Sequence, residues 1–584
     1  MLTRISWLAL AVFFAASQVY AVEPTAHDRP NIVLILIDDL SPYGINAYGA
    51  SQIGATWGQF EGTRPYRTPR LDELAHGGAR GTHAYAYPLC EPSRIALMTG
   101  QYNSRNYLRP KSQHGSDITF GDIFQREGYA TGMFGKWKQT RGTQDIPGKD
   151  YIAEFGWDEF ACFDVIGEGQ RFINPNLVIN GEVVNYKGRD DVDPDTGRRW
   201  YGPDIFNRYA LDFIDRHRDE PFFLYYPMAL VHDEHKPTPD TKPDSLFDTA
   251  DESTKYDEHR YITDMIEYTD TLIGRVVDRL DEHGLLENTV VMVIGDNGTK
   301  ESFYHVLDDG TEYFGGKGGT KDNGMRVPMI VSAPGRVSGG QVYDGLIDIV
   351  DILPTLCEAA GITPPAPAGI DGISFWPQIT GADGEHRDTI YAWYNANTPA
   401  TDTTTRLLRF AFDKDFKRYA PHKAYPNGRF FDLRTDPMEE VGDRREYPNP
   451  KWKVHFHSSG LDPASLDAEQ RAAYDALGEV IGAHAYVAVD GVDVTPSTLS
   501  LAVGEMANLD AAVTPAEATR QNVMYESSDP SVLTVDKFGA VTAIAPGEAE
   551  VLVYAWDDAW PLADNKQQGF NRDGVQASTT VRVR

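Results

Sequence analysis

The sequence predicts an α/β fold followed by a β-rich C-terminal unit, and three observations support this. Residues 31–37 form an unbroken apolar, β-branched run, which is typical of a strand buried on both faces of a sheet. From about Tyr261 to His283, apolar residues recur at three- and four-residue spacing, which predicts an amphipathic helix that Gly284 ends. Residues 486–584 contain short alternating segments separated by turn residues, as in a β-sandwich.

Three further apolar runs, at residues 221–226, 289–294 and 328–331, repeat the strand pattern of the first. Strands that alternate with helices along the chain are typical of an α/β domain, in which helices flank the sheet. We therefore expect these runs to lie together in one sheet, within a domain of residues 22–383.

Polar residues follow two of these runs at the point where each predicted strand ends. Asp38 and Asp39 come after the first run, and Asp296 and Asn297 follow the run at 289–294. Ligands bind at the carboxyl ends of parallel strands in open α/β sheets. Carboxylate and amide oxygens are hard ligands, so this pattern predicts a site for Ca²⁺, with Mg²⁺ as the alternative.

The remainder of the chain divides into two smaller units. Runs at 406–412 and 429–434 indicate strands of a smaller α+β subdomain, which we place at residues 384–485. The spacing of strands and turns in residues 486–584 resembles the bacterial group 2 immunoglobulin-like module, for which a role as spacer or attachment domain is expected.

The N-terminus predicts export. Arg4 precedes an apolar segment at residues 7–16, and Val19-Tyr20-Ala21 offers a small-x-small cleavage site, so residues 1–21 are predicted to be a signal peptide. No later stretch is apolar enough for a membrane span. The mature protein is therefore expected in the periplasm or outside the cell.

Charge and cysteine content exclude several classes of partner and fold. The chain has 54 basic and 86 acidic residues and a net charge of −32, a balance that repels nucleic acid and anionic membranes. A site for an anionic substrate must therefore bring its own positive charge. Three cysteines are too few for a disulfide scaffold, and the sequence leaves open whether Cys162 and Cys357 pair.

The motif Cys-Glu-Pro-Ser-Arg at residues 90–94 carries the most information about function. It resembles the signature of the type I sulfatases, a family of the alkaline phosphatase superfamily with a mixed sheet flanked by helices. The resemblance implies that a formylglycine-generating maturation enzyme oxidises Cys90 to an aldehyde. One hydroxyl of the hydrated aldehyde attacks sulfur, and deprotonation of the other releases sulfate, which divides a difficult hydrolysis into two easier steps.

Motifs spread over residues 29–440 extend the resemblance. The four strand-end residues match the family's metal ligands, and the oxygen derived from Cys90 completes the shell together with a sulfate oxygen. Arg94 matches the arginine that steadies the nucleophile. Lys136 matches the lysine that contacts formylglycine and the ester oxygen, and Lys317 fits a substrate-binding lysine by its spacing, with Lys321 as the alternative.

Two further positions concern proton transfer. His232 matches the family histidine that protonates or stabilises the leaving oxygen, with the nearby His235 as the alternative. The family string G-K-W-H reads Gly-Lys-Trp-Lys here, so Lys138 stands where the family commonly has its base. A charged lysine cannot accept a proton, and we expect Lys138 to bind sulfate instead.

These features together predict an exported sulfuric ester hydrolase whose substrate is a sulfated saccharide or polysaccharide. The choice of a saccharide rests on analogy with other exported enzymes that carry accessory modules. Two alternatives remain at this point. One is a formylglycine-dependent phosphodiesterase or phosphonate hydrolase of the same superfamily, and the other is a catalytically inactive glycan-binding relative.

Overall fold

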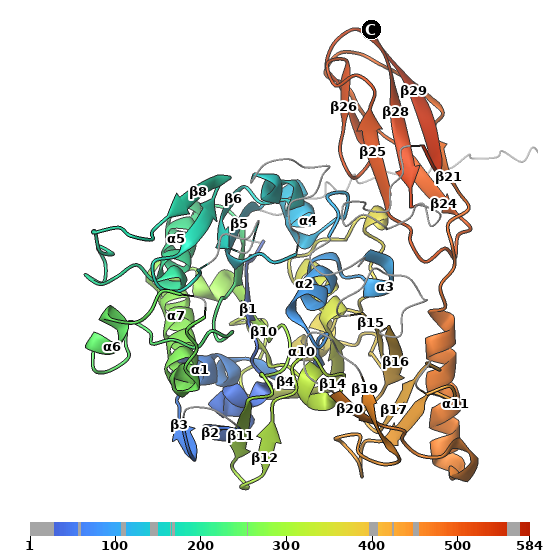
Figure 1. Cartoon of the computed structure of the whole chain (residues 1–584). Helices are drawn as coiled ribbons and strands as arrows, with labels where there is room; N and C mark the ends of the chain where they lie inside the picture. The colour runs from blue at the N-terminus through green and yellow to red at the C-terminus, as the bar shows by residue number, and fades with distance from the viewer. Residues whose placement is uncertain are drawn as a thin grey trace, which may run out of the picture.

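The fold is given by a computed structural model (Figure 1). It describes residues 29–56, 60–106, 113–139, 150–163, 165, 170–253, 255–395, 407–422, 425–447, 455–556 and 573–584. The predicted signal peptide, residues 1–21, lies outside the described residues. Among the helices that the structure describes, none is both long enough and apolar enough to cross a bilayer.

A mixed ten-stranded sheet forms the centre of the molecule, as predicted. Its strands are, in spatial order, β14 (Gln341–Asp348), β4 (Ala79–Tyr85), β13 (Met329–Ser332), β10 (Thr289–Gly295), β1 (Asn31–Ile37), β9 (Phe222–Pro227), β5 (Ala130–Lys136), β6 (Glu159–Phe163), β7 (Asn176–Ile179) and β8 (Glu182–Asn185). Strand β1 pairs in parallel with both β10 and β9, whereas β13 runs antiparallel to β10. The predicted strand at 328–331 is thus present. The sheet is mixed because β13 and β7 both run antiparallel to their neighbours.

Helices cover both faces of this sheet, which explains the unbroken apolar sequence of β1. Ile32, Leu34 and Leu36 lie in one core cluster with α2 (Cys90–Thr99), α4 (Phe120–Arg126) and α9 (Ile352–Ala359). The alternate residues Val33 and Ile35 belong to the cluster on the other face, which includes residues of α1 (Pro69–Gly77), α5 (Gly202–His217) and α7 (Ile262–Glu282). Figure 1 shows α1, α5 and α7 on one side of β1 and α2 and α4 on the other. Because side chains alternate between the faces of a strand, both sets must be apolar.

Smaller elements surround the main sheet. A second sheet contains β12 (Glu312–Phe314), β11 (Phe303–Leu307), β2 (Ala50–Ala55) and β3 (Thr63–Pro65). The C-terminal subdomain contains β15 (Ile390–Tyr394), β16 (Leu408–Phe412), β17 (Phe416–Tyr419), β18 (Arg429–Asp432), the pair β19 (Arg444–Tyr447) and β20 (His455–Ser458), and helix α11 (Ala468–Ala483). The remaining short helices are α3 (Asn103–Asn106), α6 (Ser245–Asp248), α8 (Asp322–Met325) and α10 (Trp376–Thr380). Residue 406 of the predicted strand 406–412 lies outside the described residues.

The C-terminal unit is all-β, as predicted. It contains three sheets. One pairs β21 (Gly491–Thr495) with β24 (Asp510–Thr514), and the second has the spatial order β22 (Thr498–Leu501), β29 (Gln576–Val583), β28 (Gly547–Ala555) and β25 (Val523–Ser527). The third has the order β23 (Met506–Asn508), β27 (Ala540–Ala543) and β26 (Leu533–Val535). Its own apolar core includes Leu533, Val541, Val551 and Val581.

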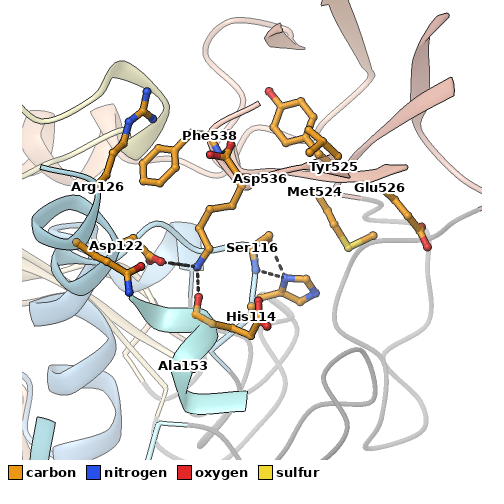
Figure 2. Close-up of a pocket in the computed structure, with 15 residues that line it drawn as sticks. His114, Ser116, Asp122, Arg126, Ala153, Met524, Tyr525, Glu526, Asp536 and Phe538 are labelled. Carbon is orange, nitrogen blue, oxygen red and sulfur yellow. Dashed lines mark hydrogen bonds and ion pairs between the residues drawn. The ribbon is translucent and has the colours of Figure 1, made fainter. Parts of the chain in front are cut away.

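This unit is docked on the N-terminal α/β domain beside a cleft of about 750 Å³. Lys537, between β26 and β27, lies 3.0 Å from the carboxylate of Asp122 in α4 and donates hydrogen bonds to the carbonyl oxygens of Asp117 and Glu154. Figure 2 shows Arg126 beside the ring of Phe538 at this cleft, where the guanidinium lies 4.4 Å from the ring centroid. The two domains therefore share a polar interface with a buried ion pair.

Candidate active site

The four strand-end residues meet at one edge of the main sheet. Because Ile37 of β1 lies opposite Gly295 of β10, Asp38 and Asp296 leave the sheet side by side. The backbone N–H of Asp39 donates to Asp296 Oδ1 at 3.1 Å, and Asn297 Nδ2 donates to Asp39 Oδ1 at 2.9 Å. All four residues are buried, at 0–2% exposure, so the parallel pairing predicted from sequence gathers three carboxylates in a site shielded from water.

This cluster has the features of a site for a hard divalent cation. Asp38, Asp39 and Asp296 each offer a carboxylate oxygen, and these oxygens lie within 4.8 Å of one another. The buried atoms Asp38 Oδ1 and Asn297 Oδ1 accept no hydrogen bond. Burial and the neighbouring Asp38 raise the pKa of Asp296 to about 7, because crowded negative charges disfavour ionisation. An oxygen-only donor set with two unsatisfied acceptors fits Ca²⁺ or Mg²⁺.

Cys90 is the first residue of α2 and lies against this cluster. Its Sγ atom, a carboxylate oxygen of Asp38 and a ring nitrogen of His232 lie within 4.8 Å of one another. Proline at position 92 stands in the first turn, where a missing N–H costs no helical hydrogen bond. Burial, and then the carboxylate of Glu91, raises the pKa of the Cys90 thiol to about 11. The unmodified residue is therefore a neutral thiol at the positive end of a helix dipole.

Arg94 lies one turn further along α2 and is fully buried. Its Nη2 and Nε atoms donate to Asp296 Oδ2 at 2.7 and 3.1 Å, and Nη1 donates to the carbonyl oxygen of Lys136 at 3.0 Å. Arg94 thus joins the Cys90 helix to the ends of β10 and β5, and these contacts hold Cys90 in place beside the carboxylate cluster.

Lys136 and Lys317 bring two further positive charges into the cluster. The ammonium of Lys136, the last residue of β5, pairs with Asp38 Oδ2, and that of Lys317 pairs with Asp39 Oδ2. Both side chains are almost fully buried. Lys317 therefore contacts the cluster directly, whereas the alternative, Lys321, is the N-cap residue of α8.

Lys138 has a different partner. Its Nζ atom lies 3.8 Å from Glu91 Oε1, and its side chain is 17% exposed. The Glu91 carboxylate also accepts from Cys90 Sγ at 3.3 Å. Lys138 adopts a left-handed backbone conformation (φ 56°), which is uncommon for a residue with a side chain. Lys138 and Cys90 thus contact the same carboxylate, that of Glu91.

His232 follows β9 and faces the same site. Its Nε2 atom lies 3.8 Å from Asp39 Oδ2, whereas Nδ1 lies 2.7 Å from Asp233 Oδ1. Burial, and then the charge of Lys317, lowers the pKa of His232 to about 4. The alternative residue, His235, instead bonds Asp257 at 2.9 Å and belongs to a separate cluster. The geometry therefore favours His232.

Three side chains near the site were not predicted from the sequence. Glu91 is the partner of both Cys90 and Lys138, and Asp233 contacts the rear of the His232 ring. Arg171 places a guanidinium nitrogen 3.0 Å from His232 Nδ1. An acid directly after a predicted catalytic histidine is a local signal that could have identified Asp233, but Arg171 is 61 residues away in sequence.

Comparison with known proteins identifies the family. The model of the family "Sulfatase" matches residues 30–362, which are more than half of the chain. These residues include the carboxylate cluster and the helix that begins at Cys90. The chain belongs to the sulfatase family. Residues 314–452 match the model "N-sulphoglucosamine sulphohydrolase, C-terminal", and residues 488–558 match "Bacterial Ig-like domain (group 2)".

Curated relatives are similar over the same region. The chain is 28% identical to human N-acetylgalactosamine-6-sulfatase over 397 residues, which are 64% of this chain and 70% of that protein. It is 26% identical to an arylsulfatase of Hemicentrotus pulcherrimus over 374 residues, 59% of this chain. The match spans 61% of the length of that arylsulfatase.

Solved structures share the fold at lower identity. BT4656, solved in complex with its substrate D-glucosamine-2-N,6-O-disulfate, superposes with a TM-score of 0.56 at 19% identity, covering 77% of this chain and 97% of that one. Ps i-CgsB, solved in complex with k-i-k-neocarrahexaose, gives a TM-score of 0.54 at 23% identity, covering 70% and 88%.

Proposed function

We propose that this chain is an exported sulfatase that hydrolyses sulfate esters of a saccharide or polysaccharide, with a formylglycine at position 90. The proposal rests on one observation above all. A cysteine at the start of a helix lies against a buried oxygen-donor cluster and is surrounded by cationic side chains, namely Arg94, Lys136, Lys138 and Lys317. In a chain of net charge −32, such a concentration of positive charge suits an anionic group.

The metal-binding part of the proposal follows from the donor set. Asp38, Asp39, Asp296 and Asn297 would hold Ca²⁺, with Mg²⁺ as the alternative, because all their available donors are oxygens. When bound, the ion supplies charge that neutralises sulfate and eases deprotonation of a neighbouring hydroxyl. Arg94 holds Asp296 by two hydrogen bonds and so keeps the donor cluster in register with the Cys90 helix.

Cys90 would be converted to formylglycine by a maturation enzyme that recognises the segment around residues 90–94. The hydrated aldehyde supplies a hydroxyl that attacks sulfur and a second hydroxyl whose deprotonation releases sulfate. The N-terminus of α2 favours the negative charge of the bound ester. Lys136 and Lys317 contribute cations on the carboxylate side, and Lys138 contributes one on the Glu91 side.

His232 is the residue that we assign to the leaving oxygen. Its Nε2 atom faces the cluster, so it can donate a proton to the alcohol as the sulfur–oxygen bond breaks. The histidine of the family string is replaced by Lys138, so we assign Lys138 to sulfate binding and leave removal of the second proton to another group or to water.

A saccharide substrate is supported by the similar proteins. Human N-acetylgalactosamine-6-sulfatase is named for a sulfated sugar, and BT4656 was solved with a sulfated glucosamine. Export is supported by the predicted signal peptide at residues 1–21, which gives the enzyme access to polysaccharides outside the cytoplasm.

The test is release of inorganic sulfate by enzyme produced together with the maturation enzyme. A panel should contain sulfated monosaccharides, sulfated oligosaccharides, an aryl sulfate and an aryl phosphodiester. We expect turnover of sulfate esters that is lost in Cys90→Ala. Faster turnover of the phosphodiester would establish the phosphodiesterase alternative instead. Glycan binding without any sulfate release, in protein with confirmed aldehyde, would establish the inactive relative.

A further inference from the structure

A chain of polar contacts extends behind His232, away from the reacting centre. The two nitrogens of the ring face opposite ways, since Nε2 faces Asp39 of the donor cluster. Nδ1 bonds the backbone carbonyl of Asp233 and lies 2.7 Å from its carboxylate. A contact on one ring nitrogen fixes the orientation of the other, as in catalytic triads. Asp233 therefore stands where a residue that orients His232 must stand.

Asp233 is itself held by a partly buried cation. Lys300 Nζ donates to Asp233 Oδ2 at 2.9 Å, so the two oxygens of this carboxylate have different partners. The Lys300 side chain is 15% exposed and lies in the loop after β10, three residues beyond Asn297. The Asp233 side chain is 29% exposed, so the pair is partly shielded from water. A charge-assisted hydrogen bond is stronger than one between neutral groups.

Lys300 is anchored in turn by a third acid. Its Nζ atom lies 3.6 Å from Asp257 Oδ2. The other oxygen, Asp257 Oδ1, accepts a hydrogen bond from the backbone N–H of His235 at 2.8 Å and lies 2.9 Å from the His235 Nδ1 atom. The rings of His235 and Phe303 meet edge to face with centroids 5.0 Å apart. The series from Asp257 through Lys300 to Asp233 thus connects His232 to a packed part of the fold.

The cluster of His235, Asp257 and His259 could also be considered as a second metal site, because its ligand atoms lie within 4.8 Å of one another. The ammonium of Lys300 at 3.6 Å from Asp257 already supplies positive charge at this point. Both oxygens of Asp257 already have partners, because Oδ1 bonds His235 and Oδ2 faces Lys300, so a scaffold role explains the cluster better.

We infer that Asp233 and Lys300 are positioning residues that hold the His232 ring with Nε2 directed at the leaving oxygen. The inference rests on the proposed function. In the step concerned, His232 starts as the imidazolium, which the negative charge of the bound ester favours. The sulfur–oxygen bond to the alcohol breaks, its electron pair stays on the alcohol oxygen, and the proton on Nε2 passes to that oxygen, which leaves a neutral ring protonated on Nδ1. The backbone carbonyl of Asp233 accepts a hydrogen bond from Nδ1–H, and the Asp233 carboxylate lies 2.7 Å from the same nitrogen. Lys300 holds this carboxylate in place through its other oxygen, beside the guanidinium of Arg171.

The consequence is a dependence on the leaving group. A sugar alkoxide is strongly basic and must be protonated as it departs, whereas a nitrophenolate leaves readily without a proton. Proton donation by a positioned side chain typically contributes about 10²–10⁴-fold to rate. Loss of the positioning pair should therefore slow saccharide and alkyl sulfates much more than activated aryl sulfates.

The experiment measures kcat/KM for a series of aryl sulfates of graded leaving-group pKa and for one saccharide sulfate. Asp233→Asn and Lys300→Met should lose about 10²-fold or more on the saccharide and less than about tenfold on the nitrophenyl ester. The slope of log kcat/KM against leaving-group pKa should be steeper in both variants than in the wild type. Lys300→Arg keeps the positive charge and should retain part of the activity on the saccharide sulfate that Lys300→Met loses. Lys242→Met, which removes a lysine from an exposed ion pair with Asp244, is the matched control.

The outcomes separate the two levels of the proposal. If wild-type enzyme turns over sulfate esters but the variants lose activity equally across the series, or lose none, the positioning role is wrong and the proposed function stands. If wild-type enzyme releases sulfate from no ester, the proposed function itself fails. Adding Asp233→Asn to His232→Ala should cause little further loss, because both act on one proton; additive losses would contradict the inference. Should Lys300→Met fold poorly, Asp233→Asn and Asp233→Glu carry the same test.

Discussion

Replacement of Lys138 by alanine tests how the site binds sulfate. The structure places the Lys138 ammonium beside Cys90, 3.8 Å from the Glu91 carboxylate, with 17% of its side chain exposed. A charge-assisted contact to an anion is worth about 1.5–3 kcal/mol, so Lys138→Ala should lower kcat/KM for sulfate esters roughly ten- to hundred-fold. The variant also leaves Glu91 without this cation, and a carboxylate close to a bound sulfate repels it.

A double-mutant cycle separates these two effects. Initial rates at constant ionic strength should show that Glu91→Gln restores part of the activity lost in Lys138→Ala, since it removes the repelling charge. Lys138→Arg keeps the charge and should lose less than the alanine variant. The pH–rate profile of Lys138→Ala should keep both limbs. If instead the alkaline limb disappears and the enzyme releases one equivalent of alcohol without matching sulfate, Lys138 is the base and the assignment is wrong.

Three other predictions concern the metal and the C-terminal unit. Removal of divalent ions should abolish turnover and lower the free energy of unfolding by about 2.7 kcal/mol relative to enzyme with calcium at a hundred times its Kd. Asp38→Asn should lose metal and activity together. Full activity with metal content verified as nil would contradict both expectations. Lys537→Met should speed limited proteolysis between α11 and β21, because Asp122 then loses its partner in a largely buried pair; an unchanged cleavage rate would show that this pair does not hold the interface. Truncation before Tyr486 should leave turnover of a small ester within about twofold of the full chain, since the unit has its own core; a folded truncated protein without activity would refute this.

The sequence was sufficient for the parts of the structure that follow local patterns. The apolar run at 31–37 and the periodic segment from Tyr261 to His283 predicted β1 and α7 to within one residue at each end. The placement of Asp38 and Asp296 after buried strands predicted their meeting, because adjacent parallel strands end at the same sheet edge.

Contacts between distant segments were beyond this reasoning. The pairing of Lys138 with Glu91 depends on how β5 and α2 approach each other, and the approach of Arg171 to His232 depends on a loop whose path no periodicity specifies. The docking of the C-terminal unit through Lys537 is similar, since a single lysine in a turn is usually a solvated surface charge. Such contacts are decided by tertiary packing.

The most direct test of the proposed function is the chemical state of residue 90 in active enzyme. Protein produced with and without the maturation enzyme should be digested with trypsin, and the peptide that ends at Arg94 analysed by mass spectrometry. The account predicts that the fraction of this peptide carrying the aldehyde in place of the thiol rises in proportion to sulfate release across preparations. Full sulfatase activity in protein whose residue 90 is entirely unmodified thiol would contradict it.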